Sequence, residues 1–148
     1  MVVVEAMTRG YQQVKTTDSI RTAAQLMREQ DIGMLPVVDE HDEIIGTVTD
    51  RDITTRAVAA GRSASTSIDC CMTSKPVFCY ADDDIYTAAE IMKREKVRRL
   101  LVRNHDQQPI GVLAQADLVA AIAPYGLAAE TVAEISQPGG AHSQQRKQ

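Results

Sequence analysis

Gly46, Thr49 and Asp52 stand where an apolar run ends and a helical pattern begins. The run Ile44–Ile45 leads into the glycine, and apolar residues return at helical spacing after the aspartate. This order puts a hydroxyl at the end of a strand and a carboxylate in the first turn of a helix, beside free backbone N–H groups. A hydroxyl and amides suit a phosphate, and a carboxylate suits the cis-diol of a ribose. The spacing therefore predicts a nucleotide-binding site. We call this motif, Gly46, Thr49 and Asp52, the first grip.

The composition narrows the class of protein. The chain has 148 residues, the usual length of one domain, with 44% hydrophobic and 24% charged residues, as in a globular protein. Aromatic residues make up 3%, so the core must be aliphatic. Few aromatic side chains and a net charge of −4 disfavour nucleic-acid binding, which relies on base stacking and positive charge.

The cysteines and the apolar runs predict a compartment. Cys70, Cys71 and Cys79 are odd in number and two are adjacent, so they form no disulfide framework or zinc-binding pattern. We therefore infer that the protein functions in a reducing compartment. The first residues lack the features of a signal peptide, and no apolar run approaches the roughly 20 residues of a membrane helix. We expect a cytoplasmic protein with no membrane insertion.

An internal repeat organises the chain. Residues 6–53 match residues 71–118 without a gap when position n is set against n+65. The identical positions include Met7-Thr8 with Met72-Thr73, Asp18 with Asp83, Thr22-Ala23-Ala24 with Thr87-Ala88-Ala89, Ile45-Gly46 with Ile110-Gly111, and Asp52 with Asp117. Two copies of one structural unit are the simplest explanation.

Each copy has the pattern strand, helix, strand, strand, helix. In the first copy, Thr17 or Asp18 can cap a helix that begins at Ile20, and Asp50 can cap the second helix. The strands between them are 34–38 and 44–49. Pro36 lies inside the first of these, which implies an edge strand or an irregular pairing.

The predicted class is α/β (α+β), with two β-α-β-β-α repeats. A three-stranded sheet with helices on one side leaves its other apolar face bare, so two copies should cover each other with pseudo-twofold symmetry and form two equivalent clefts. The predicted boundaries are 1–65 for the first repeat with its lead-in and linker, 66–125 for the second, 126–136 for a short helix and 137–148 for a disordered tail.

These motifs resemble a known family. The chain looks like a tandem pair of cystathionine-beta-synthase (CBS) domains, also called a Bateman module, as in small stand-alone bacterial proteins. The resemblance covers about residues 3–123. The residues that carry it are Gly46-x-x-Thr49-x-x-Asp52, Leu35-Pro36-Val37-Val38-Asp39, and Met72-Thr73 at the start of the second copy.

The resemblance implies a ligand and the residues that bind it. Such pairs bind adenosine-containing ligands: AMP, ADP, ATP, S-adenosylmethionine, NAD or cyclic dinucleotides. The aspartate holds the ribose, the threonine helps with ribose or phosphate, and backbone and apolar groups of the strands hold the adenine. Carried onto this chain, the ligand-binding set is Thr16, Ile32, Met34, Pro36, Gly46, Thr49, Arg51, Asp52, Arg98, Arg99 and Asp117.

The resemblance also implies a regulatory role. CBS pairs dimerise, regulate an attached or partner enzyme, channel or transporter, and do no chemistry themselves. We therefore expect a homodimer that senses an adenosine nucleotide, has no catalytic residue and requires no cofactor or metal. The regulated enzyme or transporter is not identified by the sequence.

The two grips differ. The second keeps Gly111 and Asp117 but has Ala114 in place of the hydroxyl, and losing one hydrogen bond weakens a site by about 0.5–1.5 kcal/mol. We therefore expect the grip at Thr49 to bind first. The resemblance further places a basic residue before the strand at 100–103, so Arg98 or Arg99 is expected to supply charge to the ligand of the first grip.

Other interpretations use the same residues. Asp52 alone could be an acid that stabilises the start of its helix, and Arg98-Arg99 could be a solvated charge pair. The main alternative function is a structural dimerisation module with empty clefts. An enzyme has the least support, because the sequence offers no group of nucleophile, base and orienting residue.

Overall fold

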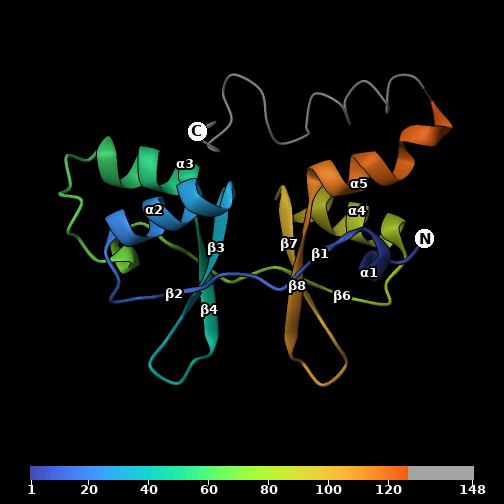
Figure 1. The fold of residues 1–148 in the computed structure, drawn as a ribbon, viewed down its shortest axis with the longest axis horizontal. Coiled ribbons are helices and arrows are strands. Elements are labelled where there is room, and N and C mark those ends of the chain that lie inside the picture. Colours follow the sequence, from blue (N-terminus) through green and yellow to red (C-terminus); the bar gives the residue numbers. More distant parts are fainter. Residues whose placement is uncertain (127–148) are drawn as a thin grey trace. The chain divides into compact units, whose positions relative to one another are not determined.

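The computed structural model describes residues 1–126, which form two compact units (Figure 1). The 12–76 unit is one continuous segment. The 77–126 unit also includes residues 1–11. Each unit has a four-stranded sheet with helices packed on it, so the predicted mixture of helices and strands is confirmed. The predicted pseudo-twofold packing of the repeats stays a prediction.

The 12–76 unit contains the first grip. Its strands, in sheet order, are β2 (Val14–Lys15), β3 (Met34–Val38), β4 (Ile44–Thr49) and β5 (Thr73–Ser74). Its helices are α2 (Ile20–Gln30), α3 (Asp50–Asp52), a π-helical continuation of α3 (Ile53–Val58), and a 3-10 turn (Ile68–Cys70). The β2–β3 pair is parallel, and the β3–β4 and β4–β5 pairs are antiparallel.

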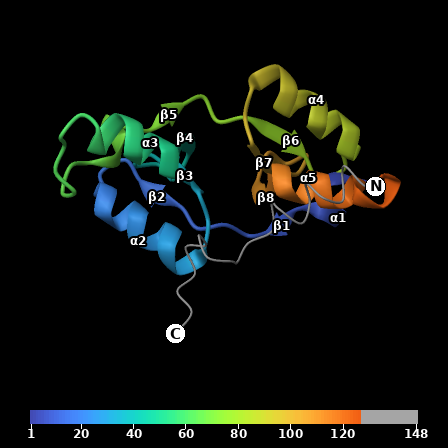
Figure 2. The same ribbon diagram turned by 90° about the horizontal axis from the view of Figure 1, so that it is seen from above.

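The 77–126 unit repeats this arrangement. Its strands, in sheet order, are β1 (Thr8–Arg9), β8 (Pro109–Ala114), β7 (Arg99–Arg103) and β6 (Phe78–Tyr80). Its helices are α1 (Val3–Ala6), α4 (Ile85–Glu95), α5 (Gln115–Ile122) and a 3-10 turn (Ala123–Tyr125). Figure 2 shows α2 beside the strands of its unit and α4 beside those of the other.

The cores of the two units use equivalent side chains. Each consists of one apolar stripe from the long helix packed on alternate residues of the central strands. The matching buried pairs are Ile20 and Ile85, Ala23 and Ala88, Met27 and Met92, Leu35 and Leu100, Val37 and Val102, and Val48 and Leu113. The internal sequence repeat therefore corresponds to the same core packing in both units.

The helix cap in the first copy differs from the prediction. The Ser19 hydroxyl, rather than Thr17 or Asp18, accepts a hydrogen bond from the Thr22 N–H at 3.1 Å. Asp18 is engaged elsewhere, because its carboxylate accepts from the Lys15 N–H at 2.8 Å. Three consecutive residues can all cap a helix, and the turn that follows β2 selects the last of them.

A fourth strand in each sheet was not predicted. Residues that open one repeat in the sequence pair with the sheet formed by the other repeat. Thr8 of β1 pairs with Val112 of β8, and Thr73 of β5 pairs with Thr47 of β4. The predicted three-stranded sheets therefore gain one strand each, and residues 1–11 belong to the 77–126 unit.

Glycine in the grip motif is explained by these added strands. A Cβ on Gly46 would overlap the Thr73 carbonyl oxygen and the end of the Met72 side chain, and one on Gly111 would overlap the Thr8 carbonyl oxygen. The glycine thus lets a neighbouring backbone approach β4 or β8. This packing role comes in addition to the predicted place of Gly46 in a ligand site.

Pro36 lies in an interior strand. β3 is flanked by β2 and β4, so the edge-strand alternative is wrong, whereas the alternative of irregular pairing is confirmed by a register shift between Val37 and Val38. β2 pairs with β3 at Val37 and Val38, beyond the proline. Pro36 therefore interrupts no ladder bond to β2.

Three further expectations concern the ends and the surface. The predicted helix at 126–136, beyond Gly126, and the predicted tail at 137–148 lie outside the described residues. Among residues 1–126, no helix is both long and apolar enough to cross a membrane. Cys70, Cys71 and Cys79 are free thiols, which agrees with the prediction that they form no disulfide framework.

We predict that Gly46→Ala destabilises the protein by about 1–3 kcal/mol, the usual cost of overpacking, because β5 must move away from β4. Urea unfolding measures this change. Gly126→Ala is the matched control, since among residues 1–126 nothing lies within 4 Å of a Cβ at that position. Equal stability of the two variants would contradict the packing role of Gly46.

Candidate functional site

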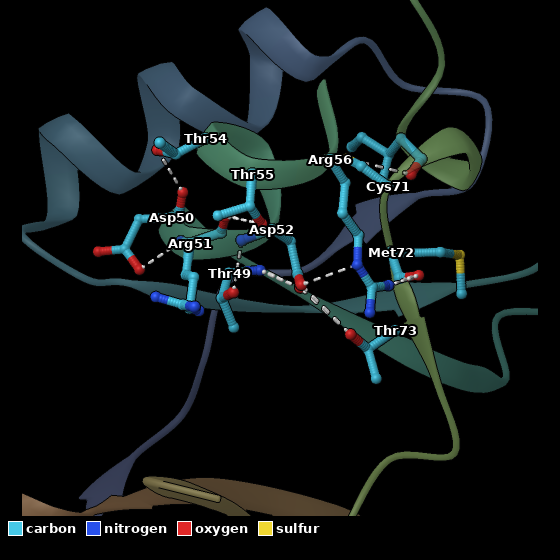
Figure 3. A network of polar contacts seen from close by, with 11 residues as sticks. Thr49, Asp50, Arg51, Asp52, Thr54, Thr55, Arg56, Cys71, Met72 and Thr73 are labelled. Atoms are coloured by element: carbon cyan, nitrogen blue, oxygen red, sulfur yellow. Dashed lines mark hydrogen bonds and ion pairs between the residues drawn. The ribbon is translucent and has the colours of Figure 1, made fainter. Parts of the chain in front are cut away.

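The first grip is a closed pair of hydrogen bonds at the start of α3. The Thr49 hydroxyl accepts from the Asp52 N–H at 3.0 Å, and the Asp52 Oδ2 accepts from the Thr49 N–H at 3.0 Å (Figure 3). This reciprocal capping box satisfies two backbone donors where a helix begins. Thr49 is therefore the cap, and Asp50, which accepts from the Arg51 N–H at 2.9 Å, is not.

The Asp52 carboxylate also faces two side chains that the sequence did not indicate. It is 8% exposed. The Thr73 hydroxyl lies 3.4 Å from both of its oxygens, and the Arg56 Nε lies 3.9 Å from Oδ1 (Figure 3). Arg56 is one helical turn beyond Asp52, and Thr73 comes from β5. The i,i+4 spacing could have revealed Arg56, whereas Thr73 required knowledge of the fourth strand.

Arg56 also connects the grip to the segment before β5. Its Nη1 donates to the Met72 carbonyl at 3.3 Å. Because 53% of the Arg56 side chain is exposed, its ion pair with Asp52 contributes little to stability. Arg56 therefore places a positive charge beside the carboxylate while remaining accessible to a ligand.

The second grip, at Gly111, Ala114 and Asp117, has one of the two reciprocal hydrogen bonds of the first. The Asp117 Oδ2 accepts from the Ala114 N–H at 2.8 Å, but Ala114 has no oxygen to accept from the Asp117 N–H. The position equivalent to Arg56 is Ala121. Burial raises the pKa of the Asp117 carboxyl, an effect that the hydrogen bond from Ala114 partly offsets. Among residues 1–126 no cation pairs with it.

The predicted basic pair lies in the 77–126 unit. Arg99 is directly opposite Ala114 in the β7–β8 ladder, and the Arg98 carbonyl accepts from the Gln115 N–H at 2.7 Å. Arg98 is exposed and Arg99 is half-buried. Both residues therefore stand beside the second grip within their unit. Their predicted service to the ligand of Thr49 and Asp52 stays a prediction.

The other predicted ligand-binding residues of the first repeat are spread along the 12–76 unit. Met34 lies opposite Thr49 and Pro36 opposite Thr47, so both share a face of the sheet with the grip threonine. Thr16 follows β2, where its N–H donates to the Val38 carbonyl at 3.1 Å. Ile32 packs against the apolar core. The structure brings Met34, Thr49 and Arg51 to one end of β3 and β4.

Comparison with known proteins identifies the family. The model of the CBS domain matches residues 3–58 and 66–124. The chain belongs to the CBS domain family. The protein YlbB of Bacillus subtilis is 32% identical over 117 residues, which is 78% of each chain.

Two solved structures of CBS proteins are similar to this chain. Hypoxic Response Protein I, solved with two coordinated zinc ions, has 29% identity and a TM-score of 0.70, and the match covers 81% of this chain and 98% of that one. CBSX2, solved in complex with AMP, has 25% identity and a TM-score of 0.69, and the match covers 84% and 97%. The predicted family and fold are thereby confirmed.

Two of the three cysteines of this CBS pair, Cys71 and Cys79, are poor nucleophiles. Burial raises the pKa of the Cys71 thiol to about 11 and that of the Cys79 thiol to about 12. Both are protonated near neutral pH, and a thiol must lose its proton before it attacks a substrate. Among residues 1–126 no three His, Cys, Asp or Glu side chains are grouped as metal ligands would be.

We predict that Ala114→Thr stabilises the protein by about 1 kcal/mol in urea unfolding, because it completes the capping box of α5. Thr49→Ala should cost a similar amount. Ala120→Thr, at an exposed position inside α5, is the control, and its lower helix propensity should make it slightly destabilising. Equal effects at positions 114 and 120 would argue against capping.

We predict that Asp117→Asn is more stable than the wild type at pH 7. A carboxyl with a raised pKa binds its proton more tightly in the folded state, so its contribution to stability is present at low pH and is lost as the pH rises through the folded pKa. The amide oxygen of asparagine can still accept from Ala114. In urea unfolding at several pH values, the advantage should disappear below about pH 4. A difference independent of pH would contradict this explanation.

Proposed function

We propose that this CBS pair is a regulatory module that binds an adenosine-containing nucleotide, with Asp52 holding the ribose. The observation that carries the proposal is the difference in contacts between the two oxygens of the Asp52 carboxylate. Its Oδ2 accepts a backbone N–H, whereas its Oδ1 has two longer contacts, to Thr73 at 3.4 Å and to Arg56 at 3.9 Å. A ribose hydroxyl at an ordinary O–H···O distance of roughly 2.7–2.8 Å would be a closer donor to Oδ1 than either.

Thr49 and Arg56 give the first grip a donor and a charge. The Thr49 oxygen accepts from Asp52, and within residues 1–126 its own proton has no acceptor, so it is available to a phosphate or ribose oxygen. Arg56 can approach a phosphate through its exposed guanidinium. The second grip, with Ala114 and Ala121 at these positions, offers its carboxylate without either partner. The first grip should therefore bind first.

The comparisons support this ligand class. Membership of the CBS family and the likeness to CBSX2, which was solved with AMP, both favour an adenosyl ligand. Thr16, Ile32, Met34, Pro36, Arg51, Arg98 and Arg99 are the further contacts that we propose. The module acts as a cytoplasmic homodimer and passes occupancy to a partner enzyme or transporter. Such signalling requires the ligand to bind two arrangements with different affinity.

One observation favours a second candidate function. Thr49 and Asp52 satisfy each other's backbone N–H groups without a ligand, so the start of α3 is complete as it stands. A structural dimerisation module with no ligand would be built in the same way. Direct binding measurements separate the two candidates.

We predict that AMP, ATP, S-adenosylmethionine or NAD raises the melting temperature of the wild-type protein. Ligand at 100 times its Kd adds about 2.7 kcal/mol of stability. Isothermal titration calorimetry then compares Asp52→Asn, which keeps an acceptor for the Thr49 N–H, with Asp50→Ala, which removes an exposed carboxylate of the same turn. Asp52→Asn should lose at least ten-fold in affinity and Asp50→Ala should lose little. No shift with any ligand at millimolar concentration would favour the structural module.

A further inference from the structure

A group of aromatic and cationic side chains lies at the C-terminal ends of the parallel strands β6 and β7, next to the turn that joins β7 to β8. Phe78 and Tyr80 share one face of β6, because Cys79 between them points into the core. The Arg103 guanidinium carbon lies over both rings, 4.7 Å from the centre of Phe78 and 5.1 Å from the centre of Tyr80. These distances are typical of cation–π contacts, which fix the plane of the guanidinium.

The hydrogen-bonding capacity of the Arg103 guanidinium is not fully satisfied within residues 1–126. Its Nε is buried and, in the part of the chain that the structure describes, has no hydrogen-bond acceptor. Within residues 1–126 it forms no ion pair, although Arg56, Lys93 and Arg94 each do. A half-buried guanidinium with an unpaired N–H is uncommon, because buried donors are nearly always satisfied.

The neighbouring acid is already engaged. His105 stacks on Tyr80 with ring centres 4.7 Å apart and an angle of 14° between the planes. Its Nε2 lies 2.9 and 2.8 Å from the two oxygens of Asp82, and this hydrogen bond lowers the pKa of the Asp82 carboxyl. Asp82 is thus paired with His105, and no carboxylate of residues 1–126 forms an ion pair with Arg103.

The fold does not require this group. The 12–76 unit has the same parallel strand pair, β2–β3, with Gln13, Lys15, Val38 and Glu40 at the positions of Phe78, Tyr80, Arg103 and His105. Two of the chain's five aromatic residues are gathered in the group. A strand pair of this kind therefore folds without the aromatic rings and the arginine, which indicates a role other than packing.

We propose that Arg103, with Phe78, Tyr80 and His105, forms a binding site for a small oxyanion, a carboxylate or a phosphate, that is separate from the nucleotide grips. Two parallel N–H groups of a guanidinium match two oxygens of either anion. The rings hold the guanidinium in place, so little side-chain entropy is lost on binding. His105, stacked on Tyr80, supports that ring from the turn that follows β7.

The test uses the full chain and the Nε–Hε signals of its arginines in ¹⁵N-edited NMR. Sodium phosphate and sodium succinate are titrated separately at constant ionic strength near pH 6. The Arg103 signal should shift and saturate with at least one anion, while the signals of the other arginines move less. Saturation with phosphate alone identifies a phosphate site, and saturation with succinate alone identifies a carboxylate site.

Three variants complete the test, each followed by backbone amide signals of residues 78–82 and 103–107. Arg103→Gln should abolish the saturable shifts, and Arg103→Lys should weaken binding at least ten-fold, because it keeps the charge but loses the paired donors. Arg94→Gln, which removes an exposed arginine paired with Glu95, should bind as the wild type does. Shifts that do not saturate, or that persist in Arg103→Gln, would overturn the proposal.

Discussion

The pairing of a short leading strand with a glycine of the grip motif supports much of the rest of the structure. β5 approaches β4 at Gly46, and β1 approaches β8 at Gly111, so closely that a side chain on either glycine would overlap the neighbouring backbone. Each contact adds a fourth strand to a sheet. In the 12–76 unit it also brings Thr73 and the Met72 carbonyl to Asp52 and Arg56. The glycine of the motif therefore determines what surrounds its aspartate.

The two grips show how one substitution changes a site built on the same backbone. Thr49 closes a capping box and keeps a proton to donate, whereas Ala114 does neither. Asp52 lies beside Arg56, while the burial of Asp117 raises the pKa of its carboxyl. Within residues 1–126, equivalent backbones thus present a carboxylate with a donor and a cation in one unit, and a carboxylate without either in the other. This difference is the physical basis for expecting unequal affinities.

Local patterns predicted the repeat, the strands of both hairpins and the closeness of Thr49 to Asp52, because these features depend on neighbours in the sequence. β1 and β5 were missed because a two-residue strand has no periodicity, and its partner lies far away in the chain. Ser19 and Thr49 were missed as caps because adjacent residues could cap equally well. The contacts of Arg103 with Phe78 and Tyr80 join residues that are more than 20 positions apart, which no local pattern reveals.

The placement of the leading strands has a consequence for how a repeat of this kind completes its sheet. Each sheet takes its last strand from the segment that opens the other repeat, so a single repeat cannot complete its own sheet in this way. A single repeat could complete its sheet with the leading strand of a second molecule, as in a domain-swapped dimer. Two copies in one chain turn such a concentration-dependent association into an intramolecular one. They can also carry different residues at equivalent positions, as with Thr49 and Ala114.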